Sequence, residues 1–177
     1  MTAWMQTSTG RKFNLADPNP QDIDILDIAH HLSQINRYTG AASEPYNVAD
    51  HSLRVMDLVE AHMPQHALAA LLHDAAEALM GDVSSPLKNH PEMRWYKAQE
   101  KKLQLMIYEK FGLPPFEPEI VKAADAVLLS TEAHNLLSPL HPDIWEGLPK
   151  PMDEFFAPLP PELAERLFLE AFRRLRG

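Results

Sequence analysis

The sequence predicts an all-α fold, a single-domain bundle of about six helices. Apolar residues recur every three or four positions through most of the 177 residues, which is the period of a helix with one buried face. No segment of useful length shows the strict alternation of apolar and polar residues that marks a strand. The chain has only 6 glycines and no glycine-rich loop, which argues against a P-loop or dinucleotide-binding fold.

The helical pattern is interrupted at residues that commonly begin or end helices. Residues 1–21 are expected to be irregular, because the run Asp17-Pro18-Asn19-Pro20 breaks regular structure. Asn47 is a suitable N-cap, Gly81 suits a helix C-terminus, and Pro161 fits a first turn. The expected helices cover residues 25–36, 47–64, 65–80, 93–111, 118–137 and 161–175.

A proline-rich segment separates the last two predicted helices. Seven of the 16 prolines lie between Pro139 and Pro161. Because proline disrupts both helices and sheets, we expect residues 138–160 to form an ordered loop that wraps the surface. Four large apolar side chains of this segment are expected to be buried: Ile144, Trp145, Phe155 and Phe156.

Charge and cysteine content exclude several classes of function. The chain has 16 basic and 25 acidic residues, a net charge of −9, so we expect no binding to a nucleic-acid polymer. A small phosphorylated substrate remains compatible, because a few local cations or a metal ion reverse the local field. With no cysteine, thiol chemistry and thiolate metal sites are excluded. Without a long apolar run or a signal-peptide pattern, no membrane partner and a cytoplasmic location are expected.

One polar cluster stands out in an apolar segment, Leu71-Leu72-His73-Asp74-Ala75-Ala76-Glu77. In a helix His73 and Asp74 point about 100° apart, so both can reach one point beside it. Glu77 follows His73 by four residues and lies over the same pair. Ionisable groups in an apolar setting cost free energy unless they are paired or bound to a metal.

Two residues elsewhere in the chain are candidate partners of this cluster. His51 shares a helical face with Val48 and Val55, and Asp125 shares one with Val121 and Leu128. Two imidazoles and two carboxylates suit a divalent transition ion, namely zinc, manganese, cobalt or iron, better than calcium. The predicted metal ligands are His51, His73, Asp74 and Asp125.

Each of these residues taken alone has a simpler explanation. His51 alone fits a hydrogen-bonded core histidine, Asp125 alone fits an ion pair with Lys122, and Glu77 fits a solvated helix surface. A His-Asp dipeptide also occurs by chance in many proteins. The metal site is favoured because one explanation accounts for four inward-facing polar positions together.

The pattern of His51, His73-Asp74 and Asp125 resembles the H…HD…D signature of HD-domain metal-dependent phosphohydrolases. Around it, the spacing of Glu77, Asp82, Pro86 and Lys88 is similar to that in YfbR-type 5′-deoxynucleotidases and phage dATP triphosphohydrolases. Arg37-Tyr38 resembles the arginine–aromatic pair of that family, with tyrosine where tryptophan is usual. The resemblance covers residues 10 to about 137.

This resemblance implies a helical HD fold spanning residues 1–177 and the roles of individual residues. Glu77 would be the acid or base near the attacking water, and Asp82 would assist at the reacting phosphate or the sugar hydroxyl. Arg37 and Lys88 would hold phosphate oxygens, and Tyr38 would pack on the sugar or base. The implied substrate-binding residues are Arg37, Tyr38, Pro86 and Lys88.

The function implied is removal of phosphate from 2′-deoxynucleoside 5′-monophosphates by metal-activated water, with a small nucleotide as partner. An alternative is a deoxynucleoside triphosphohydrolase that releases triphosphate whole. A further alternative is an HD module that binds nucleotide without turnover. A purely structural metal fits less well, because closed structural zinc sites usually use cysteine. The sequence is also compatible with a homo-oligomer and shows no decisive interface signal.

Overall fold

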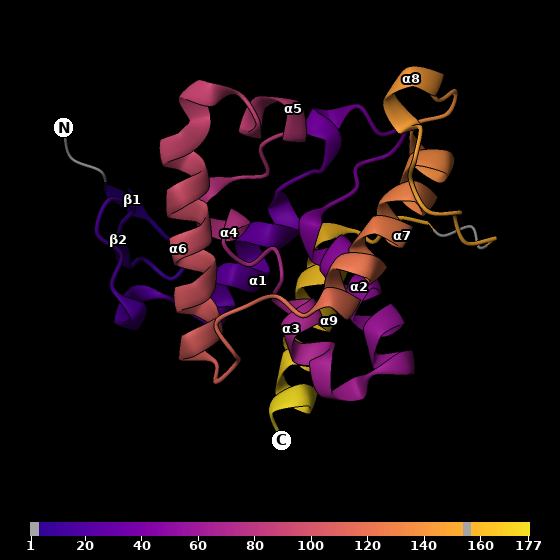
Figure 1. Ribbon diagram of the computed structural model, residues 1–177. Helices are drawn as coiled ribbons and strands as arrows, with labels where there is room; N and C mark the ends of the chain where they lie inside the picture. Colours follow the sequence, from indigo (N-terminus) through magenta and orange to yellow (C-terminus); the bar gives the residue numbers. More distant parts are fainter. Residues whose placement is uncertain (1–3, 154–156) are drawn as a thin grey trace.

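The computed structural model describes residues 4–153 and 157–177, and it confirms the mostly helical fold (Figure 1). Five long helices correspond to five of the six predicted from the sequence. Short helices and 3-10 turns connect them. The helices in the described residues are α1 (Ile25–Gln34), α2 (Val48–His62), α3 (Ala67–Leu71), α4 (Glu77–Met80), α5 (Ser85–Lys88), α6 (Arg94–Lys110), α7 (Glu119–Leu136), α8 (Pro142–Trp145) and α9 (Pro161–Arg176).

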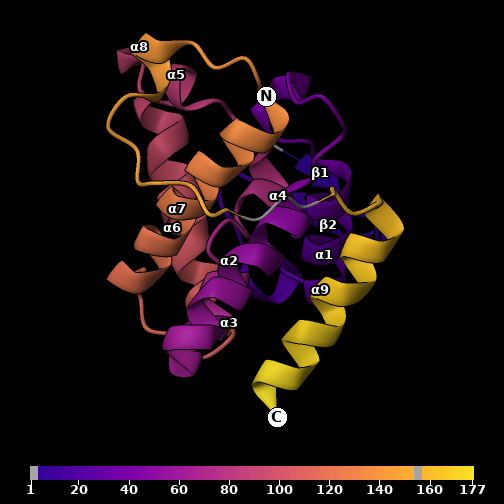
Figure 2. The same ribbon diagram turned by 90° about the vertical axis from the view of Figure 1, so that its right-hand side faces the viewer.

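Helix α2 lies at the centre of the bundle and contacts α1, α3, α7 and α9. Its apolar face is buried as the sequence pattern predicts, with Val48, Val55 and Val59 fully inaccessible to solvent. Figure 2 shows α9 along one side of the molecule, next to α1 and α2. Phe168 of α9 is fully buried, and Phe172 packs edge-on against Phe111 with ring centroids 5.0 Å apart. The core therefore fixes α2, which carries His51.

The prediction of one continuous helix over residues 65–80 is wrong. Helix α3 ends at Leu71, and residues 72–76 form turns before α4 begins. Gln104 of α6 explains the break, because its side chain donates to Leu72 O (2.6 Å) and accepts from Ala76 N (3.0 Å). These contacts satisfy backbone groups that a continuing helix would otherwise use. His73 and Asp74 consequently lie on a tight turn rather than in a regular helix.

The N-terminal segment is more regular than expected. Strand β1 (Trp4–Gln6) pairs antiparallel with β2 (Lys12–Asn14), and Phe13 is fully buried. Asp27 of α1 holds the hairpin loop by accepting from Ser8 Oγ (2.6 Å) and Thr9 N (2.7 Å). The expectation of an irregular segment without strands is therefore wrong here. The sequence did not predict these strands because three residues are too short to show a recognisable alternation.

The proline-rich segment contains α8 and is otherwise loop within its described part. Ile144 is 69% exposed, so its predicted burial is wrong, and Trp145 is half-buried. Phe155 and Phe156 lie outside the described residues. The segment is tied to the bundle, because Met152 N donates to Thr131 Oγ1 (3.0 Å) and Asn47 Nδ2 donates to Leu159 O (3.0 Å). Among the described helices, none combines the length and apolarity needed to cross a membrane.

Candidate metal centre

His51 lies in the first turn of α2 and is fully buried. The turn is fixed by Asn47, whose side-chain oxygen accepts from Asp50 N (2.9 Å) as the predicted N-cap. The ring nitrogen Nδ1 of His51 donates to Glu132 Oε1 of α7 (2.6 Å). This contact assigns the proton of the neutral ring to Nδ1, and it leaves Nε2 as an acceptor.

His73 is oriented in the same manner from the turn after α3. Its Nδ1 donates to the carbonyl oxygen of Ala70 (2.8 Å), which can only accept, so in the neutral ring its Nε2 is also left with a lone pair. The Nε2 atoms of His51 and His73 face each other at 3.2 Å. In the neutral rings both nitrogens carry lone pairs, and a proton or a metal ion between them removes their repulsion. Fixing of Nδ1 by a carboxylate or carbonyl is also the usual arrangement in metal-ligating histidines.

Two carboxylates complete the cluster. Asp74 Oδ2 lies 3.5 Å from His51 Nε2 and 3.3 Å from His73 Nε2, and Asp125 Oδ1 of α7 lies 3.2 Å from His51 Nε2. The ligand atoms of His51, His73 and Asp74 all lie within 4.8 Å of one another. The structure thus brings all four predicted ligand residues together from α2, the turn and α7. The donor set of two nitrogens and two oxygens fits a divalent transition ion.

The electrostatic field at this point attracts positive charge. Burial lowers the pKa of His73, but the charge and hydrogen bond of Asp74 outweigh it and raise that pKa to about 10. Burial raises the pKa of Asp74, yet His73, His51 and Arg37 together hold it well below its usual range. A field that stabilises an imidazolium in a buried site also stabilises a bound metal cation.

Glu132 organises the surroundings of the centre, whereas its sequence position left open a residue that orients a ligand, a solvated residue and a core-paired one. Its fully buried carboxylate accepts from Tyr46 Oη (2.8 Å) and from Tyr38 Oη, and Arg37 Nε lies 3.2 Å from Glu132 Oε2. Burial raises the pKa of Glu132, but Arg37 and His51 outweigh it and lower the pKa to about 2. The sequence signal for Glu132 was its seven-residue spacing from Asp125, which places both on one face of α7.

Arg37 and Tyr38 lie beside the centre. Arg37 Nη1 is 3.6 Å from Asp74 Oδ2, and its side chain is only 11% exposed. Tyr38 and Thr39 both adopt positive φ angles, of 58° and 50°, which is a strained backbone for residues other than glycine. The Tyr38 hydroxyl donates its proton to Glu132, so that proton is engaged in a hydrogen bond within the protein.

Glu77 forms a second buried carboxylate near Asp74. Its Oε1 contacts Lys88 Nζ at 2.9 Å, and the same nitrogen contacts Glu100 Oε1 of α6 at 2.7 Å. Burial and repulsion by Asp74 raise the pKa of Glu77 to about 8 against the opposing effect of Lys88. Its other oxygen, Oε2, is buried without a hydrogen-bond partner in the described structure. Glu77 therefore has the poised pKa and free oxygen of a candidate acid–base group.

The remaining predicted residues lie at the edge of this arrangement. Asp82 is partly buried, and burial raises its pKa against the attraction of Arg37 and Lys88. Pro86 lies exposed in the first turn of α5, where its fixed φ favours the helix start. Pro86, Arg37 and Tyr38 lie outside the lining of the cleft described next.

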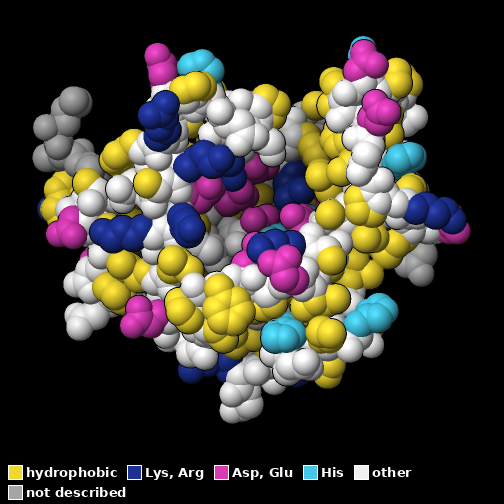
Figure 3. Space-filling model, viewed as in Figure 1, with side chains coloured by type: hydrophobic (Ala, Val, Ile, Leu, Met, Phe, Trp, Pro, Cys, Tyr) yellow, Lys and Arg dark blue, Asp and Glu magenta, His cyan; other side chains and the backbone are white. Residues whose placement is uncertain are grey.

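The centre opens into a cleft of about 930 Å³ lined by His73, Asp74 and Asp125 at one side and by α6 at the other. Figure 3 shows this hollow, with acidic side chains deep inside it and Lys and Arg side chains on the wall next to α6. Phe116, which is 60% exposed, contributes an aromatic surface from the loop between α6 and α7. The volume is in the range of small-molecule sites.

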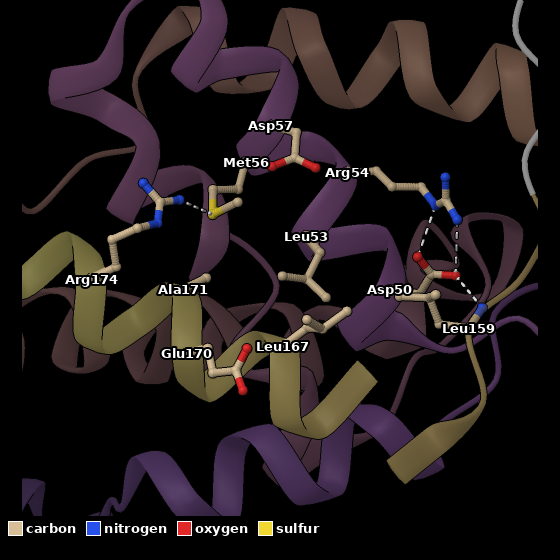
Figure 4. Close-up of a pocket in the computed structure, with 10 residues that line it drawn as sticks. All are labelled: Asp50, Leu53, Arg54, Met56, Asp57, Leu159, Leu167, Glu170, Ala171 and Arg174. Atoms are coloured by element: carbon tan, nitrogen blue, oxygen red, sulfur yellow. Dashed lines mark hydrogen bonds and ion pairs between the residues drawn. The ribbon is translucent and has the colours of Figure 1, made fainter. Parts of the chain in front are cut away.

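A separate cavity of about 440 Å³ lies between α2 and α9 (Figure 4). Leu53 and Leu167 face each other inside it. At one end, Asp50 accepts from Arg54 Nε (2.8 Å) and from Leu159 N (2.8 Å). Because Asp50 precedes His51, these contacts anchor the segment before α9 to the first turn of α2.

The fold and the centre define a class: a helical protein with a buried His/Asp candidate metal centre that opens into a cleft. The chain is 38% identical over 178 residues to the Uncharacterized protein YfdR of Escherichia coli strain K12, covering 98% of this chain and 96% of YfdR. The chain therefore belongs to the family of YfdR. It is also 38% identical over 144 residues to an uncharacterized protein of Rhodobacter capsulatus, covering 76% of this chain and 73% of that protein. No protein-family model matches the chain.

Proposed function

We propose that this protein is a metal-dependent phosphohydrolase of the HD type that removes phosphate from 2′-deoxynucleoside 5′-monophosphates. The observation that supports the proposal is the meeting of the His51 and His73 Nε2 atoms, at 3.2 Å, beside the carboxylates of Asp74 and Asp125. These groups come from three separate elements, and both rings are held at Nδ1 so that their lone pairs point inward.

His51, His73, Asp74 and Asp125 would hold the metal. A divalent ion bound there supplies Lewis-acid polarisation of a phosphoryl oxygen and lowers the pKa of a coordinated water towards ~7. Arg37, whose guanidinium lies beside Asp74, would hold and orient the phosphate through two parallel N–H groups.

Glu77 would carry the proton transfer. Burial raises the pKa of Glu77 and favours the protonated carboxyl, and Lys88 fixes its position through Oε1. From there Glu77 would give its proton to the 5′ oxygen of the departing nucleoside as the phosphorus–oxygen bond breaks. It would be reprotonated from solvent in the following turnover. General acid assistance of this kind contributes about 10²–10⁴ in rate.

The test is phosphate release from dAMP by the purified full-length chain before and after chelation. Activity is expected to stop with chelator and to return with added Mn²⁺, Co²⁺ or Zn²⁺. The His51→Ala and Asp74→Ala variants should lose activity while far-ultraviolet circular dichroism shows that the fold is retained. Full activity in either folded variant would overturn the proposal, and so would the absence of nucleotide hydrolysis with every metal.

Product analysis separates the alternative of a triphosphohydrolase. A monophosphatase releases orthophosphate from dAMP, whereas a triphosphohydrolase releases inorganic triphosphate from dATP. The reacting phosphate would occupy the same position in both, next to the four metal ligands.

A further inference from the structure

The loop between α6 and α7 contributes residues 115–117 to the lining of the cleft. Glu119, Lys122 and Asp125 of α7 also line it and follow one another at spacings of three residues, so they share one face of the helix. At a rise of ~1.5 Å per residue, Glu119 lies ~9 Å along the helix axis from Asp125. The loop, which joins α7 at Glu119, therefore lies at the far end of this wall from the candidate metal ligand.

The backbone of this loop is held at both ends. Leu113 N donates to Tyr108 O of α6 (2.8 Å), and Val121 N of α7 donates to Pro118 O (3.0 Å). Three of the residues 114–118 are prolines, whose rings fix the φ angle. A loop that is ordered before binding presents its side chains to a ligand at a lower cost in entropy.

Phe116 presents an aromatic ring to the cleft from this loop. It is 60% exposed although it is large and apolar, so most of its surface lies outside the core. Hydrophobic side chains border the hollow in Figure 3, next to the charged groups inside it. An accessible aromatic ring is a platform on which a nucleobase can stack, because every base has a flat π-face.

Glu117 places a carboxylate directly after that ring. It is half-buried and lines the cleft, and within residues 4–153 and 157–177 its side chain makes no hydrogen bond or ion pair. Burial raises the pKa of Glu117, His73 opposes this effect, and the charges of Asp74 and Asp125 add to it. The carboxylate therefore lies within electrostatic reach of the candidate centre, and it favours a ligand that supplies N–H donors.

We propose that Phe116 and Glu117 form the base subsite of the nucleotide, with the ring stacked on the base and the carboxylate accepting from guanine. This inference rests on the proposed function and names the base that it favours. A carboxylate only accepts hydrogen bonds. Among the four DNA bases, guanine alone presents two neighbouring N–H donors on one edge, N1–H and the N2 amino group, so both carboxylate oxygens find a partner.

This subsite assigns the base contact to a residue that the sequence did not suggest. The family resemblance implied Tyr38 for the sugar or base, but Tyr38 does not line the cleft, whereas Phe116 does. With its phosphate at the candidate metal centre, a monophosphate would extend along α7 towards the loop. The subsite touches no reacting atom, so it contributes to substrate binding and to the choice of base.

The experiment compares dGMP with dIMP, which lacks only the N2 amino group, in the wild type and in the Glu117→Gln and Phe116→Ala variants. Glu109→Gln and Trp95→Ala are matched controls, because both residues are exposed and lie outside the cleft lining. The ratio kcat/KM is measured for both nucleotides with added Mn²⁺. Binding of the phosphonate analogue of dGMP, in which CH₂ replaces the 5′ oxygen, is measured by calorimetry, so that base recognition is observed without turnover.

The wild type should prefer dGMP over dIMP by roughly tenfold or more in kcat/KM, the effect of one hydrogen bond to a charged group. Glu117→Gln should bring this ratio close to one. Phe116→Ala should weaken binding of the analogue by roughly tenfold, and Phe116→Trp should restore it, because stacking needs only the aromatic ring. Both control variants should keep wild-type values.

Equal use of dGMP and dIMP by the wild type would overturn the inference, and so would binding of the analogue by Phe116→Ala that matches the Trp95→Ala control. The outcomes also separate this inference from the proposed function. Analogue binding that depends on Phe116 and Glu117, without hydrolysis of any nucleotide, would refute the proposed function and leave the base subsite standing. Hydrolysis of dGMP and dIMP at equal rates would do the reverse.

Discussion

Replacing Glu132 with glutamine removes the negative charge that His51 and Arg37 share. The glutamine is nearly isosteric, and its amide oxygen can still accept from one donor. It cannot serve as the counter-ion of the guanidinium 3.2 Å away, nor as a charged partner of His51 Nδ1. Glu132 is fully buried in the wild type. The variant therefore removes the charge of this side chain while it keeps nearly the same volume in the core.

The magnitude follows from the pKa of Glu132, which is lowered from 4.5 to about 2. A shift of this size corresponds to about 3 kcal/mol of differential stabilisation of the carboxylate. Because the folded-state pKa is depressed, this stabilisation is present above pH 4.5 and is lost as the pH falls towards 2. We expect Glu132→Gln to lower the free energy of unfolding by about 3 kcal/mol at pH 7, and to weaken metal binding by about 10–100-fold.

Urea unfolding at pH 7 measures the first effect and metal titration by calorimetry the second. Glu119→Gln is the matched control, since Glu119 lies on the same helix with a side chain that is 88% exposed. The control should change the free energy of unfolding by less than about 0.5 kcal/mol. If Glu132→Gln matches the control in both unfolding and metal affinity, the assignment of Glu132 as the residue that orients His51 is wrong.

Three further outcomes test other parts of the site. Hydrolysis should fall as the pH rises through about 8, where Glu77 loses its proton. A pH–rate profile of Glu77→Gln should lack this descending limb, and an unchanged limb would assign the titration to another group. Gln104→Ala should lower the free energy of unfolding by about 2 kcal/mol in urea titrations, because two backbone groups of the turn lose their partner, whereas wild-type stability would show that the turn does not depend on α6. Adding metal to about 100 times its dissociation constant should stabilise the chelator-treated protein by about 2.7 kcal/mol, and Asp125→Asn should need more metal for the same rise in melting temperature; no metal-dependent rise would contradict the candidate centre.

The meeting of the candidate ligand residues could be predicted from the sequence because the signal for it is local. His51 and Asp125 occupy positions in register with apolar residues of their own helices, and burial of those apolar faces brings both side chains to the centre. His51 is fully buried there, whereas the Asp125 side chain stays 41% exposed at the edge of the cleft. The long helices were predicted for the same reason, with boundaries near recognisable caps such as Asn47.

The errors arose where distant contacts decide the local structure. The break after α3 depends on Gln104, which lies 32 residues beyond Leu72. The residues around His73 therefore give no local signal that the helix ends there. The N-terminal hairpin depends on Asp27 in α1, about 18 residues from the loop that it holds. The exposure of Ile144 shows that an apolar side chain in a loop is buried only if the loop itself packs against the core.

The network around Glu132 joins the two halves of the proposed chemistry. One carboxylate orients His51, a candidate metal ligand, and also pairs with Arg37, the candidate phosphate-binding residue that reaches Asp74. Neither side chain can shift without disturbing the other. The free-energy cost of burying these charges is offset only while the set stays complete, because removing one member leaves an uncompensated charge in the core. A buried ionic cluster is therefore a poor way to gain stability but an effective way to hold a cation and an anionic substrate in fixed relative positions.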